Sequence, residues 1–182
     1  MRTLFTALTV ALAIGTAVAQ SPAAAEASFN DAAIVFQRAA AGEKSEVEPA
    51  IAAFEVLARA EPRSPLYAAY LGSAISLKAR AAWMPWNKMK YAEQGLDHID
   101  RALEALKPDH DRHSVRGVPV GLETRFVAAS TFIKLADGIF HRQAAGRKLL
   151  DDLLRHPGLV AAPESFRRAV QKTAAEAAKA GQ

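Results

Sequence analysis

Residues 64–91 constrain the fold of this chain most, because they join a helix-spaced apolar face to a bend that no helix interior accepts. Leu66, Tyr70 and Ala74 recur at every fourth position, which places them on one face of an α-helix. Gly72 interrupts this face, and a glycine inside a helix costs roughly 1 kcal/mol relative to alanine. Such a glycine is usual where a second helix approaches closely, so the segment predicts helix-on-helix packing.

The bend contains both tryptophans of the chain, Trp83 and Trp86. Pro85 lies between them, lacks the amide hydrogen that a helix interior needs, and clashes with the preceding turn. One helix therefore ends at this segment and the next one begins there. Asn87 is the expected cap of the second helix.

Apolar periodicity predicts an all-α fold of about seven helices in one domain, with the first four helices paired as two antiparallel hairpins. The expected helices are 28–41, 45–61, 64–83, 87–107, 122–140, 142–156 and 163–180, and a polar connection is expected at 109–121. Ser45 and Glu48 have the form of a capping box at the start of the second helix. The residues expected in the core are Leu71, Leu96, Ile99, Leu103, Phe126 and Ile133.

Residues 1–19 have the order of a secretory signal, with Arg2 at the head, an uncharged apolar run and an Ala-Val-Ala end. We expect cleavage after Ala19 and a periplasmic or secreted protein. The alternative, a membrane anchor, needs a longer run of about 20 apolar residues. Residues 20–27 are small and polar and are expected to form a flexible lead-in to a helical domain at 28–180. No transmembrane span is expected after cleavage.

Composition excludes several classes of function. The chain has no cysteine, so it has neither a disulfide nor a thiolate metal site. The formal net charge of +4 is mild for 182 residues, and no run of lysines and arginines follows the pattern of a phosphate-binding surface. We therefore expect no nucleic-acid partner. With 51% apolar residues, the chain is instead suited to one domain with a sizeable core.

One part of the chain resembles a known repeat family. The residues that carry the resemblance are Ala50, Phe54, Leu57, Pro62, Leu71 and Gly72, with Ala102, Leu103 and Pro108 as a second copy of the ending. This order resembles the tetratricopeptide repeat, in which a proline closes one helical hairpin and the next helix carries Leu-Gly. The match covers about residues 45–108, and its two copies are farther apart than in the family because the tryptophan segment is inserted. The resemblance implies stacked helical hairpins and protein–protein recognition.

The segment Asp109-His110-Asp111-Arg112-His113 is the candidate for metal chemistry, with two imidazoles and two carboxylates close together. No distant third ligand is marked, and Arg112 opposes a cation, so we expect a solvated loop. The chain also lacks a Gly-x-Ser-x-Gly motif, a cysteine nucleophile and a glycine-rich phosphate loop. We therefore expect no catalytic residues, no metal and no cofactor.

The candidate binding site is the tryptophan segment, with Trp83, Trp86, Lys88 and Lys90 as the partner-contacting residues. No acidic residue lies between Lys78 and the end of this segment, so lysines border a large apolar bend. Such a bend suits an acidic partner, with aromatic contacts and ammonium donors acting together. The alternative is that the two indoles only plug the end of the helical stack.

Three functions remain open from the sequence. The first is an exported adaptor that binds an unidentified protein partner without catalysis. The second is a peripheral protein that docks on anionic envelope surfaces through the lysines and tryptophans. The third is a metal-dependent enzyme that uses His110 and His113. Saturable partner binding, salt-sensitive vesicle binding and retained metal would distinguish them.

Overall fold

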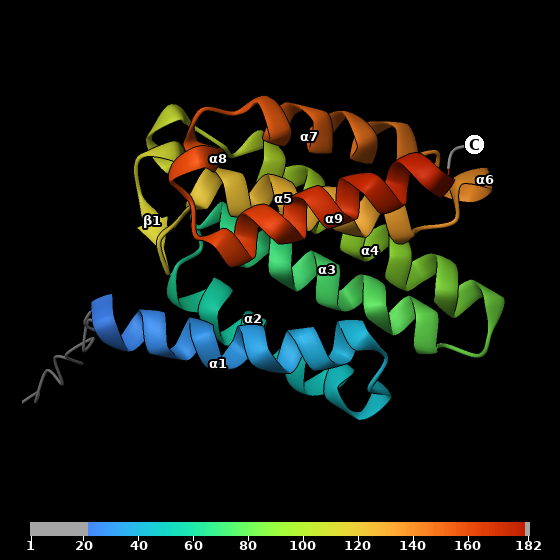
Figure 1. The fold of residues 1–182 in the computed structure, drawn as a ribbon. Coiled ribbons are helices and arrows are strands. Elements are labelled where there is room, and N and C mark those ends of the chain that lie inside the picture. The colour runs from blue at the N-terminus through green and yellow to red at the C-terminus, as the bar shows by residue number, and fades with distance from the viewer. Residues whose placement is uncertain (1–21, 181–182) are drawn as a thin grey trace, which may run out of the picture.

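Helices dominate the computed structural model, which describes residues 22–180 (Figure 1). The α-helices within these residues are α1 (Pro22–Ala41), α2 (Val47–Ala60), α3 (Pro65–Ala81), α4 (Pro85–Glu104), α5 (Val120–Lys134), α6 (Asp137–Phe140), α7 (Gln143–Arg155), α8 (Gly158–Ala161) and α9 (Glu164–Ala180). The shorter elements are the 3₁₀-helices η1 (Lys44–Glu46) and η2 (Pro108–Asp111) and the strands β1 (Ser114–Val115) and β2 (Val118–Pro119). The all-α class is confirmed. The helices longer than one turn in this part of the chain number seven, as the periodicity predicts.

Long helices that follow one another in the chain pack as antiparallel pairs, whereas α3 and α5 run parallel (Figure 1). α1 packs on α2 and α3 packs on α4, while α5 lies between α3 and α7. α9 covers α7 and part of α5. In Figure 1, α1 (blue) and α9 (red) run along the molecule with α3 between them. The contacts of α3 are with the amino-terminal hairpin, with α4 and with α5.

Helix α1 begins earlier than the sequence predicts. It starts at Pro22 and takes in residues 22–27, which we expected to form part of a flexible lead-in. Alanine has the highest helix propensity and proline is tolerated in the first turn, so the alanine run extends the helix. Ser28 lies inside this helix, where its hydroxyl donates a hydrogen bond to the carbonyl oxygen of Ala24 (2.9 Å). The rest of the expected lead-in and the whole signal peptide lie outside the described residues.

Two of the expected helix caps are wrong. Ser45 lies inside η1, and α2 begins at Val47 without a side-chain cap. At the bend, Pro85 is itself the first residue of α4 and Met84 precedes it, so Asn87 lies in the first turn. Proline is favoured at a first helical position, because the amide hydrogen that it lacks has no partner there. Pro85 thus begins α4 and also prevents α3 from continuing through the bend.

The helix expected at 122–140 is two helices. α5 ends before Leu135, whose backbone is extended (φ −80°, ψ 150°), and α6 follows. The side-chain amide of Gln143 donates a hydrogen bond to the carbonyl oxygen of Leu135 (3.3 Å), which satisfies a group freed by the break. The break lets Phe140 pack against the cluster around Ile99. Apolar spacing continues through this point, so periodicity alone does not reveal it.

The polar connection expected at 109–121 is more ordered than a loop. It contains η2 and a hairpin in which Val115 pairs with Val118. Arg116 (φ 55°) and Gly117 (φ 74°) form the turn. Positive φ at both central positions is typical of the two-residue turn that matches the twist of a hairpin. The hairpin is short because α5 begins immediately after it.

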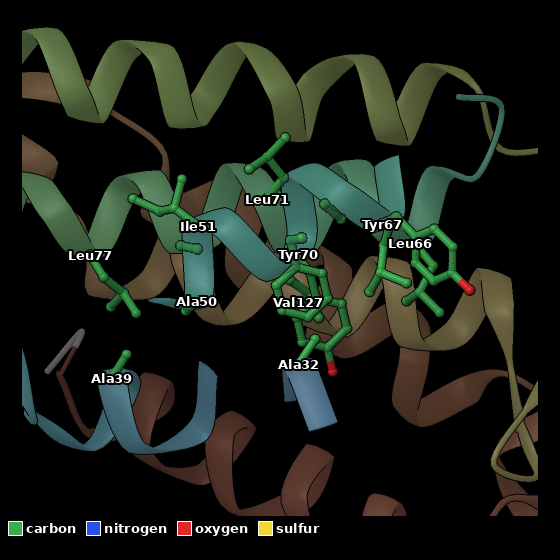
Figure 2. Close-up of a cluster of buried hydrophobic side chains, with 14 of the residues drawn as sticks. Ala32, Ala39, Ala50, Ile51, Leu66, Tyr67, Tyr70, Leu71, Leu77 and Val127 are labelled. Carbon is green, nitrogen blue, oxygen red and sulfur yellow. The ribbon is translucent and has the colours of Figure 1, made fainter. Parts of the chain in front are cut away.

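Aromatic side chains of α1, α2 and α3 fill the main core. Phe54 stacks on Tyr70 with ring centroids 4.7 Å apart, and Phe29 and Phe36 meet these two rings edge-on. Figure 2 shows Tyr70 at the centre of this cluster, with α3 supplying the most residues. The apolar face that dominates the sequence of α3 therefore becomes the centre of the fold.

The expected core residues divide into two groups. Those that are buried as predicted are Leu71, Leu96 and Ile99. Those that are only partly buried are Leu103, Phe126 and Ile133. The second group lies at the borders between smaller clusters, where a neighbouring helix covers only part of each side chain. A helical period identifies the inward face but not how completely a neighbour covers it.

Gly72 brings α3 and α4 together, as its position in the apolar face predicts. A Cβ atom added at Gly72 would lie 2.5 Å from the carbonyl oxygen of Gly95 in α4. A Cβ atom at Gly95 would lie 2.5 Å from the carbonyl oxygen of Gly72 and 2.1 Å from the Ser76 hydroxyl oxygen. The two helices therefore cross backbone to backbone at a pair of glycines.

Candidate functional site

The tryptophan bend, defined here as residues 82–90, connects α3 to α4. Ala82 leaves the helical conformation (φ −67°, ψ 138°) while its amide still donates to the Lys78 carbonyl oxygen (3.0 Å). Met84 is also extended (φ −81°, ψ 132°) and leads into Pro85. The helix ends on both sides fix the course of this short connection.

Both tryptophans of the bend are exposed. Trp83 is 89% exposed and Trp86 is 63% exposed. Met89, one turn after Trp86 on α4, is also exposed. An indole that plugs the end of a helical stack would be buried, so the packing alternative does not describe these two side chains. Their role in binding stays a prediction.

The charges at the bend are unequally compensated. The Lys78 ammonium lies 2.6 Å from a Glu48 carboxylate oxygen and 4.9 Å from the Tyr91 ring centroid. The hydrogen bond to Glu48 raises the pKa of Lys78. Lys88 and Lys90 are exposed, and neither forms an ion pair within the described residues. The uncompensated positive charge therefore lies on α4, beside the indoles.

A second feature is a buried polar cluster under the hairpin. The Tyr70 hydroxyl donates a hydrogen bond to Glu123 Oε1 (2.7 Å), and Arg116 pairs with the same oxygen. The Arg116 guanidinium also lies over the Phe29 ring, 4.7 Å from its centroid. This cluster joins α1, α3 and α5 to the turn of the hairpin. A positive φ at an arginine is uncommon and costs strain, so the turn holds Arg116 where it can reach Glu123.

Burial controls the protonation of this cluster. Desolvation raises the pKa of Glu123, and the Arg116 charge opposes it in part. Desolvation, followed by the Glu123 charge, raises the pKa of Tyr70 well above its ordinary value. Glu123 Oε2 and Arg116 Nε are buried without a hydrogen-bond partner in the part of the chain that the structure describes, and both residues line a cavity of about 330 Å³ that α9 also borders. Water is the usual partner of such groups.

The sequence analysis missed this cluster. A signal was present, because Glu123 lies four residues before Val127 on the apolar face of the expected helix at 122–140. A carboxylate on an inward face needs a buried partner. The partner, Arg116, comes from the segment expected to be a polar connection, and Tyr70 comes from a distant helix. Only the tertiary structure brings the three together.

The histidine segment has local partners. The His110 Nδ1 atom accepts a hydrogen bond from the Lys107 amide (2.9 Å), and His113 Nδ1 lies 2.8 Å from the Asp109 carbonyl oxygen. Asp109 pairs with a neighbouring arginine. Asp111 accepts a hydrogen bond from a guanidinium of α5. Within residues 22–180, no three histidine or acidic side chains converge as metal ligands would.

Comparison of the chain with family models, with curated proteins and with solved structures gives no match. The resemblance to tetratricopeptide repeats therefore stays a prediction. Among residues 22–180, none of the helices is both long and apolar enough to cross a membrane.

Proposed function

We propose that this protein is an exported, non-catalytic module that docks through the tryptophan bend on an anionic envelope surface. The observation that carries the proposal is the 89% exposure of Trp83 beside Lys88 and Lys90, which are exposed and have no ion pair within the described residues. Exposed apolar side chains that gather in one place, as Trp83, Trp86 and Met89 do here, mark sites of contact with a protein or a membrane. The bend is not needed to close a core, since the main aromatic cluster lies in α1, α2 and α3.

The shape of the bend favours a lipid surface. An indole that is exposed on nearly every side projects from the protein instead of lining a depression. Tryptophan is enriched at the boundary between water and hydrocarbon, because its ring is apolar and its N–H is polar. Trp86 and Lys90 are four residues apart in α4 and so lie on one face. Ring and ammonium are thus placed to contact the headgroup region together.

Electrostatics favours an anionic surface. Each lysine or arginine close to a negatively charged membrane contributes about 1 kcal/mol to binding. Lys88 and Lys90 have no ion pair within the described residues, so no acidic side chain there reduces their attraction to an anionic surface. This attraction is screened by salt over a distance of about 10 Å at 0.1 M. Binding should therefore weaken as the salt concentration rises.

Vesicle sedimentation tests the proposal. The purified protein should sediment with phosphatidylglycerol vesicles at low salt and much less with phosphatidylcholine vesicles. Replacing Lys88 and Lys90 by glutamate should reduce binding to the anionic vesicles by roughly tenfold or more. Trp83→Ala should weaken binding that remains at high salt. None of these exposed changes should alter the free energy of unfolding by more than about 0.5 kcal/mol.

A matched control makes the same charge change elsewhere. Arg63 precedes α3 and Lys107 follows α4, whereas the bend follows α3 and precedes α4. These sites are separated by the 17 residues of α3, or about 25 Å. Arg63→Glu with Lys107→Glu should leave most vesicle binding intact. If both double variants bind equally, or if the wild type ignores anionic vesicles, the lipid assignment is wrong.

The adaptor function is the other outcome of this test, and the helical-hairpin resemblance supports it. A protein partner predicts saturable capture from an envelope extract that lipid does not affect. The same lysine variants would then abolish capture without any vesicle binding in the wild type. Export is tested separately by the amino terminus of protein from an envelope fraction, which should be Gln20. Intact Met1 in a soluble cytoplasmic pool would refute it.

A further inference from the structure

A second cavity lies between α1, α3 and α5 and shares Gln37, Tyr70 and Phe126 with the cavity beside Glu123. Its volume is about 200 Å³, and its apolar walls include Phe36 and Ala40 of α1, Leu77 of α3 and Val127 of α5. In Figure 2, Leu77 points from α3 toward α1 near Ala39. This volume is smaller than the roughly 300–1,000 Å³ of pockets for drug-sized ligands. The cavity therefore suits a narrow ligand.

Three hydroxyl groups in the wall, those of Ser73, Ser76 and Thr131, are already hydrogen-bonded within the protein. The Ser73 and Thr131 hydroxyl oxygens are 2.8 Å apart, and Thr131 also donates to the Val127 carbonyl oxygen (2.9 Å). Ser76 donates to the Gly72 carbonyl oxygen (3.0 Å). These hydroxyl groups therefore have little remaining capacity to form hydrogen bonds with a polar ligand. The inner part of the cavity behaves as an apolar surface, despite its serines and threonine.

The mouth of the cavity has the opposite character. Arg80 lies in the last turn of α3 and Lys134 is the last residue of α5, and both line the cavity. Within the described residues, neither side chain forms an ion pair with an acid. Ser130 is one turn before Lys134 and also lines the cavity, and its hydroxyl oxygen is buried without a hydrogen-bond partner among residues 22–180. Two cations and an unpaired hydroxyl thus border an apolar interior.

The Arg80 charge affects the pKa of Lys134. The Lys134 side chain is exposed overall, yet the desolvation that it does experience lowers its pKa. The Arg80 charge lowers the pKa of Lys134 further, and only Glu176 opposes this. An anion at the mouth would relieve the repulsion between the cations. A carboxylate fits well, because a guanidinium binds its two oxygens with parallel hydrogen bonds.

We propose that this cavity binds an aliphatic carboxylate, with the chain between α1, α3 and α5 and the carboxylate at Arg80, Lys134 and Ser130. A fatty acid of medium chain length has this chemistry. A peptide terminus is disfavoured, because its backbone amides would enter a cavity where the hydroxyl groups of Ser73, Ser76 and Thr131 are already paired. The site shares no proposed contact residue with the tryptophan bend, so either proposal stands if the other fails.

Calorimetric titration with decanoate and decanol tests the site. Both ligands have the same chain, but only decanoate is charged. The purified protein should bind decanoate more tightly than decanol. Lys134→Gln and Arg80→Gln should each weaken decanoate binding by roughly tenfold, which is the scale of one charge-assisted hydrogen bond, and leave decanol binding unchanged. Arg63→Gln, at the other end of α3, removes an exposed positive charge and should change neither affinity.

A cavity-filling change tests the position of the chain. Ala40→Phe should weaken the binding of both ligands, because its ring would occupy the apolar interior. Circular dichroism and the denaturation midpoint show whether this variant folds. If it does not fold, the charge variants still decide the matter, since both replaced side chains are exposed. Equal affinity for decanoate and decanol, or wild-type decanoate affinity in both charge variants, would overturn the proposal.

Discussion

The crossing of α3 and α4 at Gly72 gives the sharpest test of the fold. In Gly72→Ala, the new Cβ atom would lie 2.5 Å from the Gly95 carbonyl oxygen and 2.8 Å from the Cβ atom of His98. The first of these neighbours is backbone, so it cannot move aside as a flexible side chain would. The helices must separate, and the contacts around Ile99 loosen with them. Overpacking of this kind costs about 1–3 kcal/mol, and a backbone clash belongs at the upper end.

Alanine also gains helix propensity over glycine, by up to about 1 kcal/mol, which offsets part of the cost. Gly138→Ala is the matched control for that gain. Gly138 lies in α6, and a Cβ atom added there has no neighbour within 4 Å. We expect Gly138→Ala to be neutral or to stabilise slightly, and Gly72→Ala to lower the free energy of unfolding by about 2 kcal/mol.

Urea denaturation followed by circular dichroism measures both variants. A shift of the midpoint with an unchanged slope assigns the effect to stability alone. If Gly72→Ala is as stable as Gly138→Ala, the helices do not approach at this glycine pair. The account of how α3 and α4 pack would then be wrong.

The other stability predictions concern the buried cluster and the core. Tyr70→Phe leaves the carboxylate of Glu123 without its hydroxyl donor and should lower the free energy of unfolding by about 1.5–3 kcal/mol. The control is Tyr67→Phe, because the Tyr67 hydroxyl has no hydrogen bond within the described residues. This change should cost under about 0.5 kcal/mol. Since burial raises the pKa of Glu123, the folded state keeps this proton at pH values where the unfolded chain has lost it. The difference in free energy of unfolding between the wild type and Glu123→Gln should therefore be largest below the ordinary glutamate pKa. It should fall as the pH rises through the raised pKa of Glu123. A difference that does not change with pH would contradict the raised pKa. Ile99→Ala should lower the free energy of unfolding by about 2–5 kcal/mol, and Leu103→Ala should lower it less because the Leu103 side chain is only partly buried. Equal urea-denaturation midpoints for these two variants would show that the burial of the two side chains does not differ.

The sequence by itself determined the fold class and the positions of the long helices. Helical period is a local property, because residues three and four apart share a face whatever lies opposite. The break at Pro85 is local for the same reason, since the ring and the missing amide act within one turn. The close approach at Gly72 was also visible, because a glycine in an apolar face leaves room for a neighbour. The sequence did not show that Gly95 is the other half of the contact.

Helix ends and the short elements needed the tertiary structure. The start of α1 at Pro22 and the break before α6 depend on small differences in propensity and on what the flanking side chains contact. The turn at Arg116 has a backbone conformation that arginine seldom adopts, so local preference argues against it. The pairing with Glu123 and the contact with Phe29 hold it in place. Long-range contacts overrode local preference there.

The candidate sites show the same division. A sequence reveals that Trp83, Trp86, Lys88 and Lys90 are neighbours in the chain, but exposure depends on which helices cover the bend. Arg80 and Lys134 meet at one cavity only because α3 and α5 pack side by side and end at the same end of the bundle. Contacts between residues far apart in the chain follow from how complete helices pack, and no local pattern encodes that arrangement.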